Sequence, residues 1–259
     1  MQIEIDTSKT VEENAAFYFE KAKKAKRKIQ GVKKALLMFE KEKKELISSK
    51  EEAVKKYEEK EKERRKPKRT KKWYEKFRWF ISSEEFLCIG GRDATTNEII
   101  VKKHMLSEDI VFHTEAPGSP FFVIKTSGKK VGEKTLKETA QATAVFSRAW
   151  KMGLGSTKVY WIKPSQVRKE LGLPKGSFMI HGKRNYSEPI LEMAIGINSE
   201  GIIMGGPISA VKKNCSKFLI LVQGKKKKSD IAKQIKSEIG GEIDDIISSL
   251  PAGDFEIKK

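Results

Sequence analysis

A heptad pattern in the N-terminal part of the chain limits the structures that this part can form. Apolar residues recur at spacings that alternate between four and three, and two lysines interrupt them. The positions are Val11, Ala15, Tyr18, Ala22, Ala25, Ile29, Val32, Leu36, Phe39, Lys43, Leu46, Lys50, Ala53 and Tyr57. Such a repeat, with Lys and Glu in between, is typical of a coiled coil. We predict a protruding helix from about Thr10 to Arg65, with roughly 70 Å between Val11 and Tyr57.

The apolar seam of this helix needs a partner, whose identity the sequence leaves open. Ser49 followed by Glu52 has the spacing of a capping box, which permits a break or hairpin near residues 48–50. A hairpin would pair the seam with the short return segment 51–65. The alternatives are a second copy of the chain, which means self-association, or residues upstream of this sequence.

A basic segment follows the helical part. Between Arg64 and Arg78, nine residues are Lys or Arg and one, Glu75, is acidic, and Pro67 ends the helix. The segment is either a solvated linker or a collar that contacts phosphates. These features predict a coiled-coil arm at 1–66, a basic linker at 67–76 and a globular domain at 77–259.

The globular part has the pattern of an α+β fold. Short β-branched and aromatic runs predict strands at 86–89, 110–113, 121–126, 158–162, 177–181, 190–197 and 217–222. Helices are expected at 93–105, where Thr95 and Glu98 have capping-box spacing, at 135–153 and at about 229–239. Because strands and helices do not alternate regularly, we predict an α+β domain with a mixed sheet.

The charge balance indicates a polyanionic partner. Fifty-four Lys and Arg against thirty-five Asp and Glu give a formal net charge of +19 and a pI near 9.7. Nucleic acid and an acidic membrane surface both fit such a charge. The apolar run Phe218–Val222, which no other run exceeds in length, is far shorter than the roughly 20 residues of a membrane span. With no signal-peptide pattern at the N-terminus, we expect a cytoplasmic protein that has no membrane partner.

Motifs for catalysis or metal binding do not stand out. His104, His113 and His181 lack HxxxH or HExxH spacing, and Cys88 and Cys215 lack CxxC spacing. The turn at Gly90 and Gly91 precedes a predicted helix, but the lysine of a phosphate-binding loop does not follow. We therefore expect a protein that is not an enzyme and needs no cofactor or metal.

Several cations beside turns and aromatic residues are candidates for RNA contacts. Arg92 and Asp93 follow two glycines at a predicted helix start, where N–H groups and a guanidinium suit phosphate; alternatively, Asp93 caps the helix and Arg92 pairs with it. Lys125, Arg148 and the turn at 182–186 each place a cation beside a hydroxyl or an aromatic ring, which suits unstacked bases. His113 is also consistent with a packed strand residue.

Dispersed motifs in a fixed order carry a resemblance to a known family. They are Trp79-Phe80-Ile81-Ser82-Ser83, Gly90-Gly91-Arg92-Asp93-Ala94 with Asn97-Glu98, Ser147-Arg148-Ala149-Trp150, Tyr160-Trp161, Pro164-Ser165-Gln166-Val167, and Gly176-Ser177-Phe178-Met179-Ile180 with Gly182-Lys183. Together they resemble the NFACT-R domain of ribosome-quality-control factors, the family of nuclear export mediator factor and bacterial fibronectin-binding protein A-like proteins. Glu13-Asn14-Ala15 and Tyr18-Phe19 are similar to the start of the family's coiled-coil arm.

The resemblance implies an RNA-binding part of a factor that binds the large ribosomal subunit and tRNA on stalled nascent-chain complexes and supports template-free C-terminal tailing. The family's large N-terminal NFACT domain does not precede the coil here, so the sequence is expected to be truncated or to be half of a larger protein. That domain or its helices would then be a partner. The alternative function is a coiled-coil interaction scaffold without a direct RNA role. The Lys-, Glu- and Ile-rich composition favours a thermophilic prokaryote or an archaeon, and we expect an archaeal source.

Twelve residues within or beside these motifs are the expected contacts with ribosomal RNA or tRNA. They are Arg92, Asp93, Asn97, Lys102, Lys103, His113, Lys125, Arg148, Gln166, Lys183, Arg184 and Tyr186. The basic surface that they would form is the main functional prediction from the sequence.

Overall fold

A computed structural model describes residues 4–48, with the backbone alone for 42–48, and residues 70–258. The chain divides into two compact units, Met1–Thr70 and Lys71–Lys259. None of the helices in these described ranges combines the length and the apolar character that a bilayer span requires.

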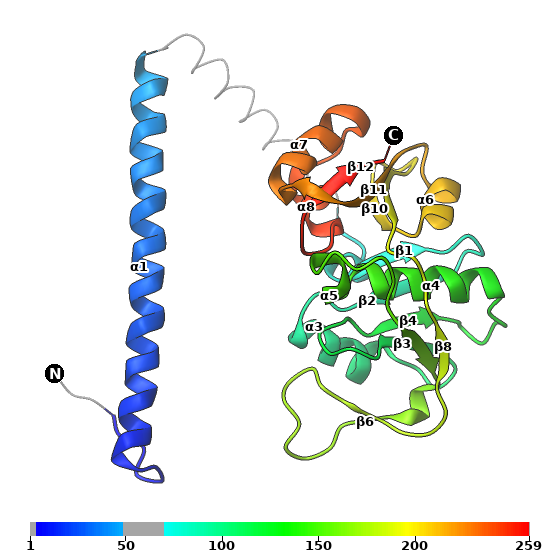
Figure 1. Ribbon diagram of the computed structural model, residues 1–259, viewed down its shortest axis with the longest axis horizontal. Coiled ribbons are helices and arrows are strands. Elements are labelled where there is room, and N and C mark those ends of the chain that lie inside the picture. The colour runs from blue at the N-terminus through cyan, green and yellow to red at the C-terminus, as the bar shows by residue number, and fades with distance from the viewer. Residues whose placement is uncertain (1–3, 49–69, 259) are drawn as a thin grey trace. The chain divides into compact units, whose positions relative to one another are not determined.

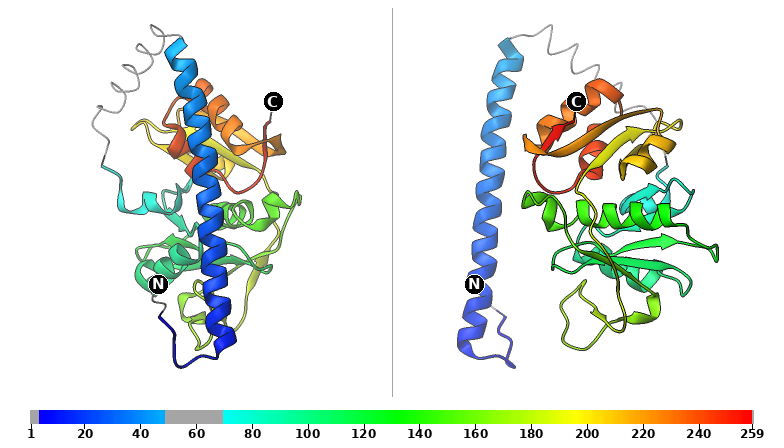
Figure 2. Two further views of the ribbon diagram at one scale, coloured as in Figure 1. Left: turned by 90° about the vertical axis from the view of Figure 1, so that its left-hand side faces the viewer. Right: turned by 45° about the vertical axis from the view of Figure 1, so that its right-hand side comes forward.

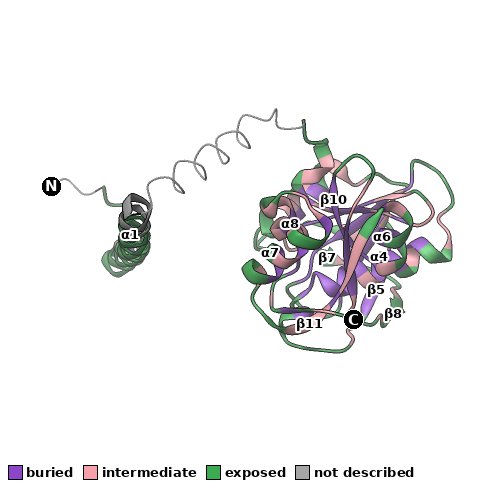
Figure 3. Ribbon diagram, turned by 90° about the horizontal axis from the view of Figure 1, so that it is seen from above, coloured by how far each residue is buried: buried purple, intermediate pink, exposed green. Residues whose placement is uncertain are grey.

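The first unit contains one long helix, α1 (Val11–Ser48) (Figure 1). A reciprocal capping box starts it, because the Glu13 N–H donates to the Thr10 hydroxyl and the Thr10 N–H donates to the Glu13 carboxylate. The seam residues Ile29, Val32 and Leu36 are 56%, 54% and 55% exposed, and Figure 3 shows the described part of α1 as exposed. The long N-terminal helix is thus confirmed as far as Ser48. Its predicted continuation to Arg65, and the capping box at Ser49, lie outside the described residues.

The second unit is built on a six-stranded antiparallel sheet with the order β1-β2-β4-β3-β5-β8. In chain order its strands are β1 (Arg78–Ile81), β2 (Leu87–Gly90), β3 (Ile110–Thr114), β4 (Phe122–Lys125), β5 (Val159–Ile162) and β8 (Asn185–Ser187). The 3-10 helix η1 (Trp73–Lys76) leads into β1.

A four-stranded antiparallel sheet, β10-β9-β11-β12, forms the C-terminal part of this unit. Its elements are β9 (Met193–Ile197), β10 (Ile203–Gly206), α6 (Ile208–Asn214), β11 (Lys217–Lys226), α7 (Lys228–Ile239), α8 (Ile243–Ser249) and β12 (Phe255–Ile257). A short hairpin, β6 (Val167–Arg168) and β7 (Met179–Ile180), follows the 3-10 helix η3 (Pro164–Gln166). Figures 1 and 2 show the β6 region at the end of the domain opposite this sheet.

The helices of the first sheet differ from the predicted ones at their ends. The helix after Asp93 consists of α3 (Ala94–Ile99) and the π-helix η2 (Ile100–His104), and its cap pairs Asp93 with Thr96, not Thr95 with Glu98. The predicted helix at 135–153 is two helices, α4 (Glu133–Val145) and α5 (Arg148–Lys151). Ser147 separates them, because its hydroxyl donates to the Ala144 carbonyl and accepts from the Ala149 N–H.

The α+β class is confirmed, whereas the expectation of a mixed sheet is wrong for the described residues, because every strand pair there is antiparallel. Strands β1, β8, β10 and β12 and helices α6 and α8 were not predicted. Of the strand predicted at 177–181, only the two residues of β7 are in a strand.

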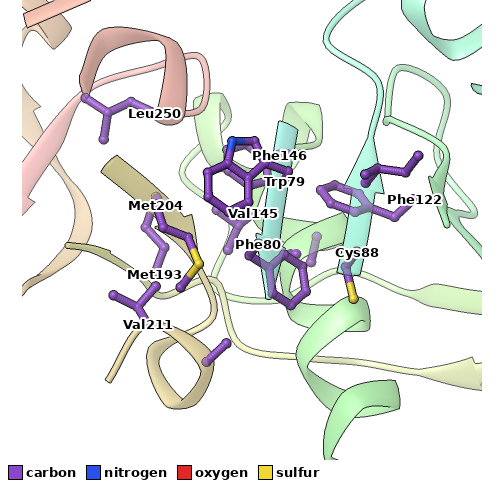
Figure 4. Close-up of a cluster of buried hydrophobic side chains, with 14 of the residues drawn as sticks. Trp79, Phe80, Cys88, Phe122, Val145, Phe146, Met193, Met204, Val211 and Leu250 are labelled. Atoms are coloured by element: carbon purple, nitrogen blue, oxygen red, sulfur yellow. The ribbon is translucent and has the colours of Figure 1, made fainter. Parts of the chain in front are cut away.

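The core continues from one sheet to the other through β1. Figure 4 shows Trp79 and Phe80 between Met193 and Met204 of the C-terminal sheet and Phe122 of the first sheet. Gly206 of β10 approaches so closely that a Cβ there would lie 3.1 Å from the Phe80 side chain. The two sheets therefore share one hydrophobic core.

Candidate nucleic-acid interface

One pocket of about 470 Å³ lies at the end of the domain that carries the β6–β7 hairpin. Three chain segments form most of it: the start of α3 with Arg92 and Asn97, the β3–β4 loop from Pro117 to Phe121, and residues 175–178 ahead of β7. Arg148, the first residue of α5, also lines it. The pocket thus combines segments that are far apart in the sequence.

Aromatic rings form one wall of the pocket. The His113 ring centroid lies 4.4 Å from that of Phe121, and Phe178 meets Phe121 edge to face at 5.4 Å. Tyr160 lies 6.1 Å from His113, and the Arg184 guanidinium lies 4.8 Å from the Tyr160 ring centroid. This arrangement offers π-surfaces next to a cation, as sites for unstacked bases do.

Two glycines allow the chain segments that line the pocket to approach one another closely. A Cβ at Gly91 would overlap the Asn97 side chain, and a Cβ at Gly176 would lie 2.5 Å from the Ala94 carbonyl oxygen. Gly176 also has φ +77°, a conformation that disfavours other residues. Its N–H donates to Glu98 at 3.0 Å, which ties the loop before β7 to α3.

Two cations that make no hydrogen bond or ion pair among the described residues lie at the pocket. Among the described residues, the guanidinium of Arg148 and the ammonium of Lys175 have no hydrogen bond or ion pair, and both side chains are exposed. The carboxylate that lines the pocket, Asp93, caps α3 by accepting from the Thr96 N–H at 2.8 Å, a bond that lowers its pKa. The pocket therefore carries a positive balance of charge.

The Arg92 side chain lines the pocket and also stabilises the fold through its hydrogen bonds. Its guanidinium donates to the carbonyls of Phe77 at 3.0 Å and Glu75 at 3.3 Å, and its Nε is buried without a partner among the described residues. Burial lowers the pKa of this arginine. Of the two alternatives from the sequence, Asp93 does cap the helix, but the hydrogen bonds of Arg92 go to these carbonyls and not to Asp93.

His113 is neutral in this environment. Burial lowers its pKa to about 4, and Nδ1 lies 2.6 Å from the Thr114 carbonyl oxygen, to which it donates. The ring is therefore an uncharged aromatic surface at physiological pH.

Five of the twelve predicted residues line the pocket: Arg92, Asp93, Asn97, His113 and Arg148. Arg184 lies next to them through Tyr160, and Tyr186 packs on the same ring at 5.8 Å. Gln166 does not line the pocket; its amide donates to the carbonyls of His181 and Lys183 and so shapes the turn that carries Lys183.

The remaining lysines lie outside the pocket. The Lys125 ammonium contacts the buried carboxylate of Asp109 and donates to the His104 carbonyl, so its charge is satisfied within the fold. Lys102 pairs with Glu98 at 2.6 Å, and Lys103 is exposed on η2. The pocket itself does not gather Lys102, Lys103, Lys125 and Lys183.

Sequence reasoning missed Lys175, Phe121 and Phe178 as pocket residues. Phe178 lies within one of the motifs that resemble the family, but the run 177–181 predicts a strand, whereas residues 177 and 178 belong to the loop before β7. Phe121 was assigned to a strand, and no local signal marks Lys175, whose position depends on the contact between Gly176 and α3.

Both cysteines are free and buried, and burial raises the pKa of Cys88 to about 12 and that of Cys215 to about 11. Within the described ranges, no three His, Cys, Asp or Glu side chains gather closely enough to hold a metal ion.

The second unit is therefore an α+β domain with an aromatic pocket rimmed by cations, a class of site that suits single-stranded RNA. Residues 76–182 match the family model described as the NFACT protein RNA binding domain. The resemblance seen in the sequence is confirmed, and an RNA-binding domain of this family occupies that part of the chain, which includes every residue of the pocket.

Relatives of greater length share this region. The protein named Archaeal Rqc2 homolog aRqcH, from Methanocaldococcus jannaschii, is 41% identical over 205 residues, which cover 75% of this chain and 30% of that protein. The human protein named Ribosome quality control complex subunit NEMF is 35% identical over 173 residues, 65% of this chain and 15% of that protein. This chain spans less than a third of the length of either relative.

A solved structure, the C-terminal part of the fibronectin/fibrinogen-binding protein of Streptococcus suis, is similar at a TM-score of 0.40 with 16% identity, covering 48% of each chain. That degree of similarity supports no functional conclusion.

Proposed function

We propose that this chain is the RNA-binding part of a ribosome-quality-control factor that contacts RNA of the large ribosomal subunit and tRNA. The observation that carries the proposal is the position of the cation-rimmed aromatic pocket within the match to an NFACT RNA-binding domain. The names of the relatives, which refer to Rqc2 and to the ribosome quality control complex, support the cellular role.

The proposed role is binding and positioning, not catalysis. A formal net charge of +19 favours phosphate contacts, and the exposed cations near the pocket supply part of that charge. As part of a longer protein, such as the relatives, the domain would hold RNA on the large ribosomal subunit in the cytoplasm. Template-free tailing of the nascent chain would take place while the RNA is held there.

A binding experiment at two salt concentrations tests this proposal. Lys175, Lys183 and Arg184 are exposed or half-buried cations at or near the pocket, and the triple alanine variant removes them without touching Arg92, whose hydrogen bonds support the fold. We expect weaker binding to tRNA and to isolated large subunits, and a salt slope reduced by up to about one unit per lost phosphate contact.

A matched variant carries alanine at Lys129, Lys130 and Lys233, exposed cations that do not line the pocket. This control variant removes the same charge as the pocket variant, and we expect it to bind RNA more tightly than the pocket variant does. If the pocket variant remains folded and binds with the wild-type affinity and slope, this surface does not bind RNA.

The alternative, a coiled-coil scaffold, is favoured by the exposed seam of α1. Replacing Ile29 and Leu36 with Asp separates the two functions. Loss of a protein partner with unchanged RNA affinity would assign the seam to protein contacts, whereas the RNA-binding proposal predicts that tRNA affinity survives the change.

A further inference from the structure

We propose that the pocket is a subsite for one unstacked nucleotide of a single-stranded RNA, with the base inside and its phosphate at the rim. The inference rests on the proposed RNA-binding function and specifies how the site would select a single-stranded segment. Its volume of about 470 Å³ falls within the range of small-ligand pockets, roughly 300–1,000 Å³.

The interior suits the face of a base. His113, Phe121 and Phe178 line the pocket and contact one another through their rings, and His113 is uncharged there. Bases that leave a helical stack in RNA are commonly received by such side chains. A duplex cannot present a base in this way, so the pocket favours loops, bulges or strand ends.

One polar side chain inside the pocket, Asn97, has a donor group that makes no hydrogen bond among the described residues. Asn97 is 9% exposed, and its Oδ1 accepts from the Phe121 N–H at 3.1 Å. Its Nδ2 makes no hydrogen bond among the described residues and is not among the buried atoms there, so it is accessible from the pocket and free to donate. A carbonyl or ring nitrogen on the edge of a base would supply the acceptor.

The rim suits a phosphate. Arg148 packs across Gly118, so that a Cβ on this glycine would lie 2.7 Å from the Arg148 Nε. The contact holds the guanidinium at the pocket, and no carboxylate of the described residues neutralises it. Lys175 lies on the neighbouring loop. The two cations can therefore take the phosphodiester of the nucleotide whose base is inside.

The three histidines of the chain provide a positional test. His113 lines the pocket, whereas His104 and His181 do not. We suggest observing the imidazole Cε1–Hε1 signals of the full chain by NMR during titration with a mixed-sequence RNA hexamer. The His113 signal should shift in a saturable way, and the other two should move much less.

A pocket-filling variant supplies the control. Ser177→Phe places a ring in the pocket, and Ser165→Phe makes the same change at an exposed position of η3 that does not line it. Ser177→Phe should abolish the His113 shift and weaken hexamer binding by about 5- to 150-fold, the equivalent of one lost base stack. Ser165→Phe should change neither. Asn97→Asp, which keeps the acceptor for the Phe121 N–H but removes the donor, should also reduce the His113 shift if Ser177→Phe does not fold.

The results of these experiments distinguish failure of the nucleotide subsite from failure of the proposed RNA-binding function. Salt-dependent hexamer binding with a static His113 signal, and the same affinity in Ser177→Phe, would overturn the subsite and leave the proposed RNA-binding function standing. Absence of hexamer, tRNA and subunit binding would overturn both. Nucleoside 5′-monophosphates form the second arm: if they shift His113 and bind more tightly than the hexamer, the pocket is a site for a free nucleotide and not for an RNA strand.

Discussion

Two arginines of the pocket have opposite roles at the scale of single residues. The Arg92 guanidinium donates to the Phe77 and Glu75 carbonyls just ahead of β1, whereas the Arg148 guanidinium has no partner among the described residues. Since the same side-chain type serves the fold in one case and remains available in the other, stability and RNA affinity can be separated by mutation.

We predict that Arg92→Ala lowers the free energy of unfolding by about 2 kcal/mol, because it removes charge-assisted hydrogen bonds to partly buried carbonyls. Arg148→Ala should lower it by less than about 0.5 kcal/mol, since the side chain is exposed. Urea unfolding measured side by side checks the difference. Equal losses in the two variants would contradict the structural role of Arg92.

His113 predicts a pH dependence of stability. Its pKa is lowered to about 4 in the folded protein, mainly by burial, from an ordinary value of 6.5. Between these pH values the unfolded chain binds a proton that the folded chain does not, so the free energy of unfolding falls as pH decreases from 6.5 towards 4.

Between pH 7 and pH 5, His113 should lower the free energy of unfolding by about 2 kcal/mol. His113→Gln removes this titration, and its drop between the two pH values should be smaller by that amount. Carboxylates titrate in both proteins, so their effect cancels in the comparison. An identical pH dependence in the two proteins would show that His113 has the same pKa in the folded and the unfolded chain.

At the scale of elements, the loop before β7 depends on one backbone position. Gly176 has φ +77°, and its neighbour across the contact is the backbone of α3 at Ala94, which cannot yield as a flexible side chain could. The loop carries Lys175 and Phe178, so the same contact places two pocket residues.

We predict that Gly176→Ala destabilises the protein by about 1 kcal/mol or more and weakens RNA binding, because both the φ angle and the contact with α3 oppose a side chain. Gly172→Ala is the matched control: it has a similar positive φ of +83°, but a Cβ there meets no atom within 4 Å. Thermal unfolding and RNA titration of both variants check this. If the two variants bind RNA equally well, the Gly176 contact does not shape the site.

At the scale of the whole molecule, the second unit has a core of its own. Buried side chains of both sheets and of α4, α6, α7 and α8 form one cluster, and every buried hydrophobic residue of the described chain lies within residues 71–259. Helix α1, by contrast, exposes the seam residues Val11, Ile29, Val32, Leu36 and Phe39.

We therefore expect residues 71–259 to fold without residues 1–70. The shortened protein should unfold cooperatively at a temperature close to that of the full chain, because none of its core is lost. Differential scanning calorimetry of both chains tests this. A large drop in the unfolding temperature would show that the arm contributes to the stability of the domain.

The heptad ladder of α1, the α+β class and the motifs of the RNA-binding domain were determined by the sequence alone, whereas the Asp93 cap was only one of two alternatives there. Each depends on residues close together in the chain, or on the order of short motifs, and is therefore visible without the fold. The break between α4 and α5 could not be predicted from the sequence, because the apolar spacing continues through Ser147, where the helix is interrupted.

The composition of the pocket was decided by tertiary structure. Lys125 and Arg148 are both cations beside a hydroxyl or an aromatic residue in the sequence, yet the fold pairs one with the buried Asp109 and leaves the other at the pocket. Strand order and loop contacts bring residues 91–97, 117–121 and 175–178 together, and no periodic pattern records such distant pairings. Side-chain type sets what a residue can bind, but the partners that the fold supplies decide whether it remains free to do so.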